Sequence, residues 1–232
     1  MKKTAFLFCA AAVMSSFAQS KPDQMAVVRA ILDSAGRSDI TVESVSKTDA
    51  EGRIVFLDLT NKEMEKGGIK SIPPEIGRLR ALRELHLARN EIASLPTELV
   101  SLTALKILDL QYNQIAELPP EIGKLAALQE LDLRNNQLSQ LPKELFSLNR
   151  LSVLKLSNNN LTSLPEGVGR LSSLKQLYLS SNKLVTLPHS VIAMKRLTYV
   201  DFQDNKFCRP SAALSSWLKK WDNKWKSKQM CQ

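Results

Sequence analysis

Apolar residues return along this chain in a frame of 23 residues. The frame reads Leu-x-x-Leu-x-Leu-x-x-Asn-x-Leu-x-x-Leu-Pro and starts at Leu82, Leu105, Leu128, Leu151, Leu174 and Leu197. The last copy departs from the frame at Phe207-Cys208, and a degenerate earlier copy begins at Ile54. Each unit opens with a short alternation of apolar and polar residues, which is typical of a strand. A fixed period of this length predicts a solenoid, because one such unit cannot bury its own apolar face.

The other frame residues predict how each unit turns. Six asparagines are expected to stack into a ladder in which buried amides satisfy backbone groups at a corner of the chain; they are Asn90, Asn113, Asn136, Asn159, Asn182 and Asn205. A proline follows later in each unit, at Pro73, Pro96, Pro119, Pro142, Pro165 and Pro188. Because proline fixes φ and cannot extend a ladder, we expect a short turn or helical piece there, with a structural role.

The recurring frame resembles the leucine-rich repeat family, and the resemblance covers residues 54–207. The stretch Ile122-Gly123-Lys124-Leu125 is similar to the 23-residue class found in Ras-associated and plant leucine-rich proteins, and residues 52–59 resemble the start of the repeats in plant and bacterial members. The resemblance implies an α/β fold: a curved solenoid with a parallel β-sheet on its concave face and short turns or 3-10 helices on its convex face. It covers one degenerate, five full and one partial repeat.

The segments on both sides of the repeats are predicted to be caps. Residues 19–53 read as an N-terminal cap with a helix over 22–36 and a strand over 40–45. Residues 208–232 read as a C-terminal cap, with a helix from Ser211 to about Lys226 that carries one apolar stripe, namely Leu214, Trp217, Leu218, Trp221 and Trp225. The stripe fits a helix that covers the last repeat. It also fits a basic amphipathic helix that binds anionic membrane or cell-wall polymers.

The first 18 residues are typical of a Sec-type signal peptide. Lys2 and Lys3 precede an apolar stretch that is too short to span a bilayer, and Ser16-Phe17-Ala18 suits cleavage after Ala18. We therefore expect an exported protein of bacterial type, located in the periplasm, at the cell surface or outside the cell. Export permits a disulfide between the two remaining cysteines, Cys208 and Cys231, which would stabilise the cap by roughly 3 kcal/mol.

Positive charge is concentrated at one end of the chain. The formal net charge is +9, yet seven of the basic residues and only one acid, Asp222, lie from Lys206 onward. A nucleic-acid interface would place basic residues along the repeats with aromatic residues between them, and the repeats lack this pattern. We expect a protein partner, no nucleic acid, and a monomeric chain.

The outward-facing strand positions are the ones free to bind a partner, because the core occupies the frame residues. They are the third, fifth, seventh and eighth of each unit, and they include all three tyrosines of the chain. Exposed aromatic residues beside aliphatic and charged ones are typical of interface hot spots. The predicted partner-binding residues are His86, Ile107, Asp109, Tyr112, Asp132, Arg134, Val153, Tyr178, Tyr199 and Asp201.

The sequence gives no support to an enzyme. The two histidines, His86 and His189, fall on a strand and on a convex turn, so they cannot act together, and neither accompanies a nucleophile motif. The aspartates of the fifth column belong to a common Leu-Asp-Leu form of the repeat, and no loop has the carboxylate spacing of a calcium site. We expect no catalytic residues, no metal and no cofactor.

Overall fold

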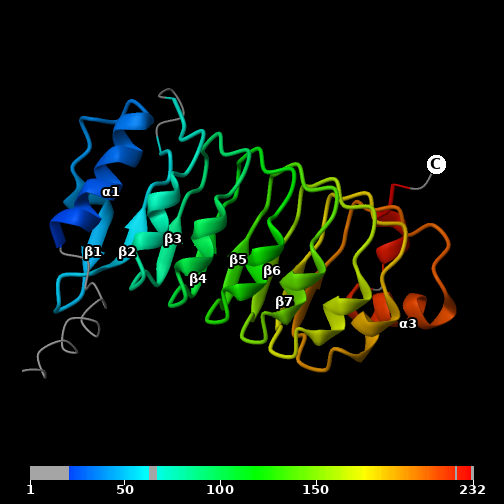
Figure 1. Cartoon of the computed structure of the whole chain (residues 1–232). Helices are drawn as coiled ribbons and strands as arrows, with labels where there is room; N and C mark the ends of the chain where they lie inside the picture. Colours follow the sequence, from blue (N-terminus) through cyan, green and yellow to red (C-terminus); the bar gives the residue numbers. More distant parts are fainter. Residues whose placement is uncertain (1–20, 63–66, 223, 231–232) are drawn as a thin grey trace, which may run out of the picture.

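The computed structural model describes residues 21–62, 67–222 and 224–230 of the chain. Within these ranges the strands follow one another in a single sheet that runs the length of a solenoid (Figure 1). Its strands are β1 (Ser46–Thr48), β2 (Ile54–Asp58), β3 (Glu84–His86), β4 (Ile107–Asp109), β5 (Glu130–Asp132), β6 (Val153–Lys155), β7 (Gln176–Tyr178) and β8 (Tyr199–Asp201). The predicted solenoid with a parallel sheet is confirmed.

The sheet keeps one register throughout the repeats. Strand order in space equals order in the chain, β2 to β8 are all parallel, and only β1 runs antiparallel to its neighbour β2. Leu85 on β3 lies between Leu57 on β2 and Leu108 on β4, and the same alignment continues to β8. A column of equivalent residues in the sequence is therefore a column of neighbours in space.

The leucines and asparagines of the frame fill the interior. Leu82, Leu85 and Leu87 are at most 1% exposed. In the ladder, the side-chain oxygen of Asn113 accepts from the backbone N–H of Ile92 at 3.0 Å, and its amide donates to the carbonyl oxygens of Leu87 and Leu110 at 2.9 and 3.0 Å. The other five ladder asparagines repeat this pattern, as predicted. Each buried amide thus links the corners of two successive repeats.

A short 3-10 helix follows the strand in each repeat from β2 to β7. The six helices are η1 (Pro74–Arg78), η2 (Thr97–Ser101), η3 (Pro120–Lys124), η4 (Lys143–Ser147), η5 (Glu166–Arg170) and η6 (His189–Ala193). The frame proline of each unit stands immediately before the helix with φ between −69° and −61°. This confirms the structural role predicted for these prolines, since the ring fixes φ of the extended residue from which the chain enters the helix.

Glycine occupies one position in every second 3-10 helix. Gly77, Gly123 and Gly169 lie on η1, η3 and η5, whereas the equivalent residues of η2, η4 and η6 are Val100, Phe146 and Ile192. A Cβ on Gly77 would lie 2.6 Å from the carbonyl oxygen of Glu98, and one on Gly169 would lie 2.6 Å from Cβ of Ser190. The glycines let the next helix approach closely, so the convex side repeats every two units.

The N-terminal cap differs from its prediction in one element. Helix α1 (Lys21–Ser34) buries Val27, Val28, Ile31 and Leu32 and ends near Gly36, which has φ +67°. The predicted strand over 40–45 is wrong, because residues 42–45 form a single helical turn, α2 (Val42–Val45), and the strand β1 starts only at Ser46. The turn puts residues 42 and 45 on one side, where both pack on the core, whereas a strand would point them to opposite faces.

The C-terminal segment packs over the last repeat. Helix α3 (Ala212–Trp221) begins at Ser211, whose hydroxyl accepts from the backbone N–H of Leu214 at 3.2 Å, as predicted. It is shorter than predicted, because Asp222 leaves the helical conformation and a 3-10 turn, η7 (Trp225–Lys228), follows. Of the stripe, Leu214, Trp217, Leu218 and Trp225 are buried in the core and Trp221 is partly buried.

Two predicted features fall at the ends of the chain. The signal peptide at residues 1–18 lies outside the described residues. Cys208 is disulfide-bonded, but Cys231 also lies outside them, so the pairing of these two cysteines stays a prediction. Among the helices of the described ranges, none combines the length and apolarity that crossing a bilayer requires.

Candidate partner-binding face

The third and fifth positions of each unit lie on one face of β2 to β8, and the seventh and eighth positions follow just after each strand; together they are here called the concave face. The strand register sets Glu84, Ile107 and Glu130 side by side, and His86, Asp109 and Asp132 beside them. Side chains at these positions are mostly half-buried or exposed, in contrast to the buried leucines between them. The ten predicted partner-binding residues therefore lie on one continuous surface, although they differ in exposure and in how many polar partners they have.

The eighth position has a backbone role that the pattern of apolar residues does not reveal. In six successive repeats this residue has a positive φ of 54–59°. Asparagine tolerates this left-handed conformation, and it occupies the position at Asn135 and Asn158. Tyr112 takes the same conformation, with φ +55° and 48% of its surface exposed, and the guanidinium carbon of Arg89 lies 5.4 Å from its ring centre. The same conformation recurs in six successive repeats, so the repeat itself imposes it, and Tyr112 adopts it with its ring exposed.

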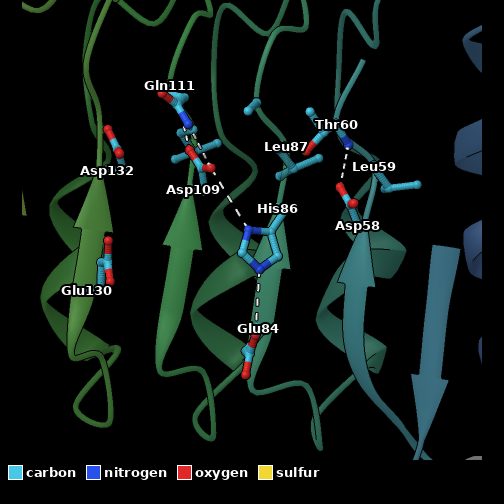
Figure 2. Close-up of polar contacts among 12 residues, drawn as sticks. Asp58, Leu59, Thr60, Glu84, His86, Leu87, Asp109, Gln111, Glu130 and Asp132 are labelled. Atoms are coloured by element: carbon cyan, nitrogen blue, oxygen red, sulfur yellow. Dashed lines mark hydrogen bonds and ion pairs between the residues drawn. The ribbon is translucent and has the colours of Figure 1, made fainter. Parts of the chain in front are cut away.

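His86 lies at the centre of the N-terminal half of the face, between carboxylates of its own and the next strand (Figure 2). Its Nε2 is 3.6 Å from Oε2 of Glu84, its Nδ1 is 3.9 Å from Oδ2 of Asp109, and its ring centre is 5.4 Å from that of Phe56. The interaction with Asp109 raises the pKa of His86 above its usual value, against the opposing effect of burial. Burial acts to raise the pKa of Asp109, but His86 and two hydrogen bonds from Gln111 outweigh it and lower that pKa.

A group of ion pairs continues from Asp109 toward β6. Asp132 is only 3% exposed and accepts from the guanidinium of Arg134, with its shortest contact at 2.6 Å. The ammonium of Lys155 lies 2.5 Å from Oε1 of Glu130 and 3.5 Å from Oδ2 of Asp132. The carboxylate of Asp132 raises the pKa of Arg134. For Lys155, burial lowers the pKa, but Glu130 and Asp132 outweigh burial and raise it overall.

These contacts join into one charged network, which comprises Glu84, His86, Asp109, Gln111, Glu130, Asp132, Arg134 and Lys155. Arg134 connects its two halves, because its guanidinium also donates to the side-chain oxygen of Gln111 at 3.2 Å. A small cavity of about 180 Å³ opens among these residues. Most of the network's charges have a partner within it, so its side chains hold one another in place.

A tyrosine pair occupies the C-terminal end of the same face. The ring centres of Tyr178 on β7 and Tyr199 on β8 are 4.9 Å apart with an interplanar angle of 38°. Tyr199 is 46% exposed, although burial of its hydroxyl, together with the charge of Asp201, raises its pKa. Asp201 lies directly beside Tyr178 in the sheet register and is partly exposed. The tyrosine pair thus offers aromatic surface next to a carboxylate.

The sequence-based site list missed part of this surface and overstated another part. Four residues of the network were not in the predicted set, namely Glu84, Gln111, Glu130 and Lys155. The only sign of them in the sequence is that opposite charges occupy neighbouring positions of successive units. Their contacts become clear once the strands are paired in the sheet. Asp132, by contrast, is nearly covered by its ion pairs and is poorly available to a partner. Within the described ranges no group of three or more His, Cys, Asp or Glu residues is arranged to hold a metal ion.

Comparison with protein families places the repeats in a known class. A model described as "Leucine rich repeat" matches residues 126–184 and 149–207, and a second, "Leucine Rich repeats (2 copies)", matches residues 80–122 and 103–147. The matches run without a gap from residue 80 to residue 207, over the repeats whose sheet and asparagine ladder are described above. The chain belongs to the leucine-rich repeat proteins. No curated protein matches this leucine-rich repeat chain.

Solved structures similar to this leucine-rich repeat protein include receptors. The ectodomain of the plant membrane receptor kinase GASSHO1/SCHENGEN3 from Arabidopsis thaliana, in complex with CASPARIAN STRIP INTEGRITY FACTOR 2, is 37% identical, with a TM-score of 0.54. That match covers 59% of this chain but only 17% of the receptor chain. A leucine-rich repeat protein of Leptospira interrogans is 31% identical over 70% of this chain and 51% of its own, with a TM-score of 0.41.

Proposed function

We propose that this protein is an exported, non-catalytic leucine-rich repeat protein that binds a partner protein through its concave face. The observation that carries the proposal is the tyrosine pair, since Tyr199 leaves almost half of a large aromatic surface exposed on a sheet face that no described element covers. Tyrosine contributes large contact area at low entropy cost and is enriched in interface hot spots. Seven parallel strands, at about 4.8 Å each, give a face roughly 30 Å across, which suits an interface of standard size.

The receptor comparison supports the same proposal. The Arabidopsis ectodomain, whose solved structure contains CASPARIAN STRIP INTEGRITY FACTOR 2, matches this chain with a TM-score of 0.54. Because this chain corresponds to a small part of that receptor, the comparison supports a binding scaffold and not the receptor's own ligand. Export, in the periplasm, at the surface or outside a bacterial cell, rests on the signal-like first 18 residues.

The test uses the purified chain as bait in envelope and host extracts, followed by titration of the captured partner against variants. Replacing Tyr178 and Tyr199 together by alanine should weaken binding by about ten-fold or more. The melting temperature should stay close to that of the unmodified chain, because both side chains lie on the surface of the sheet. Val185→Ala, which removes an exposed apolar side chain away from the concave face, is the matched control. Equal affinity of the double variant and the control would refute binding through this face.

A second candidate is contact with membrane or cell-wall polymer through the C-terminal cap. Lys219 and Lys220 on α3 are exposed and could meet an anionic surface. The apolar stripe that membrane insertion would need is, however, largely buried against the last repeat, so the concave face is the better supported site. Co-sedimentation with anionic liposomes or cell-wall fragments at low salt separates the two candidates. Charge reversal at Lys219, Lys220, Lys224 and Lys226 should abolish sedimentation if the cap binds them.

A further inference from the structure

The concave face carries the opposite charge from the chain as a whole. Its 28 positions include seven carboxylates and three Lys or Arg side chains, a formal net charge of −4, whereas the whole chain carries +9. The carboxylates are Asp58, Glu84, Asp109, Glu130, Asp132, Asp201 and Asp204. A partner that covers these positions therefore meets more carboxylates than basic groups, and this excess favours a basic partner.

Over most of the concave face, the carboxylates have basic or histidine partners. Glu130 and Asp132 are paired with Lys155 and Arg134 in the charged network, Asp109 and Glu84 flank His86, and Asp58 lies 3.2 Å from the ammonium of Lys62. At the C-terminal end, Asp201 and Asp204 form no ion pair with any basic group of the described residues. The unneutralised charge thus coincides with the tyrosine pair.

We propose that the tyrosine pair and Asp201 form a subsite for an arginine side chain of the partner protein, inserted from an extended or loop segment. This inference rests on the proposed function, because it names the chemistry of the partner that the concave face binds. Tyr178 and Tyr199 provide two adjacent ring faces on which a guanidinium can stack, and the carboxylate beside Tyr178 can accept two parallel hydrogen bonds from it.

Arginine fits this subsite better than lysine does. Its guanidinium is planar, less strongly hydrated than an ammonium, and able to stack on a ring while it donates to a carboxylate at its edge. Asp204, three residues after Asp201 and beyond the end of β8, adds a second carboxylate without lying beside the rings in the sheet register. The charges of the network next to the subsite are already paired with one another, so the network should attract or repel a partner only weakly. Asp201 therefore makes the contact that selects arginine.

The experiment titrates the full chain with a soluble peptide in which three arginines are separated by glycine and serine, and follows backbone amide signals by NMR. The matched probe replaces each arginine by citrulline, which keeps the shape and removes the charge. We expect the arginine peptide to shift signals of β7 and β8 first. We expect the citrulline peptide, or the variant Asp201→Asn, to bind at least about five-fold more weakly. The control variant Glu117→Gln, an exposed carboxylate outside the concave face, should bind as the unmodified chain does.

The outcomes separate this inference from the proposed function. Equal binding of the arginine and citrulline peptides, or no loss in Asp201→Asn, overturns the arginine subsite, and so does the absence of any shift on β7 and β8. If the partner captured from extracts still depends on Tyr178 and Tyr199 in those cases, binding through the concave face stands without the subsite. If capture is indifferent to both tyrosines, the proposed function and the subsite fall together.

Discussion

The charged network and the tyrosine pair occupy the same columns of the same sheet, yet they use them in opposite ways. In the network, Asp132 is nearly inaccessible because Arg134 and Lys155 surround it. At the tyrosine pair, Tyr199 is about half exposed and Asp201 has no basic partner among the described residues. A repeat scaffold offers identical positions, and neighbouring side chains decide whether a position stabilises the protein or remains open to a partner. Substitutions in the two regions should therefore separate stability from binding.

The largest effect is expected in the core beneath the sheet. Leu131 on β5 is fully buried beneath the sheet, so Leu131→Ala leaves a cavity and should lower the free energy of unfolding by about 2–5 kcal/mol. Denaturant unfolding followed by circular dichroism measures the loss. A loss below about 1 kcal/mol would mean that the core is not packed as described.

An intermediate effect is expected in the charged network. Arg134→Ala removes the main partner of the buried Asp132 carboxylate and should destabilise the protein by about 1–3 kcal/mol, an estimate reduced because Arg134 is one-third exposed. The exposed Arg150→Ala serves as control and should change stability by less than about 0.5 kcal/mol. Tyr199→Ala should resemble that control in stability but not in partner binding. If Tyr199→Ala destabilises the chain more than Arg134→Ala does, the contrast between the two regions is wrong.

The smallest effect should be a pH dependence at His86. Its pKa is raised in the folded protein, mainly by Asp109, so the stabilisation is complete below the ordinary value of 6.5 and is lost as the pH rises through the folded value. Glu84 and Asp58 add to the negative surroundings. The difference in unfolding free energy between the unmodified chain and His86→Gln should therefore shrink by a few tenths to about 1 kcal/mol from pH 5.5 to pH 8.5. A constant difference would show that His86 does not titrate with these carboxylates.

The fold could be predicted from the sequence because the same frame recurs six times and each copy indicates the same strand and turns. The leucines, the asparagine ladder and the prolines each have a role that depends only on their own unit and its neighbours. Residues 40–45 stand outside the repeat, and there alternation alone misled: Ile40 and Val42 alternate as in a strand, whereas Val42 and Val45, three residues apart, lie on one side of a helical turn. The end of α3 at Trp221 was missed because nothing in the stripe marks Asp222 as the residue that leaves the helix.

The candidate site could be predicted only as a set of positions. Which side chains face outward follows from the period, so Tyr178 and Tyr199 were found. Whether an outward residue is available depends on pairs across strands, such as Lys155 with Glu130, and on the left-handed backbone at Tyr112. Neither is visible in the apolar pattern of a single unit.

The glycines on alternate 3-10 helices change what counts as one module of this protein. The third column of the concave face alternates with the same step of 46 residues, as Ile107, Val153 and Tyr199 stand between Glu84, Glu130 and Gln176. Deleting one 23-residue repeat would set two like helices against each other and shift the apolar and polar sides of the binding surface out of phase. Deleting or duplicating two repeats together would preserve both. Shortened or extended versions of this scaffold are therefore best built in pairs of repeats.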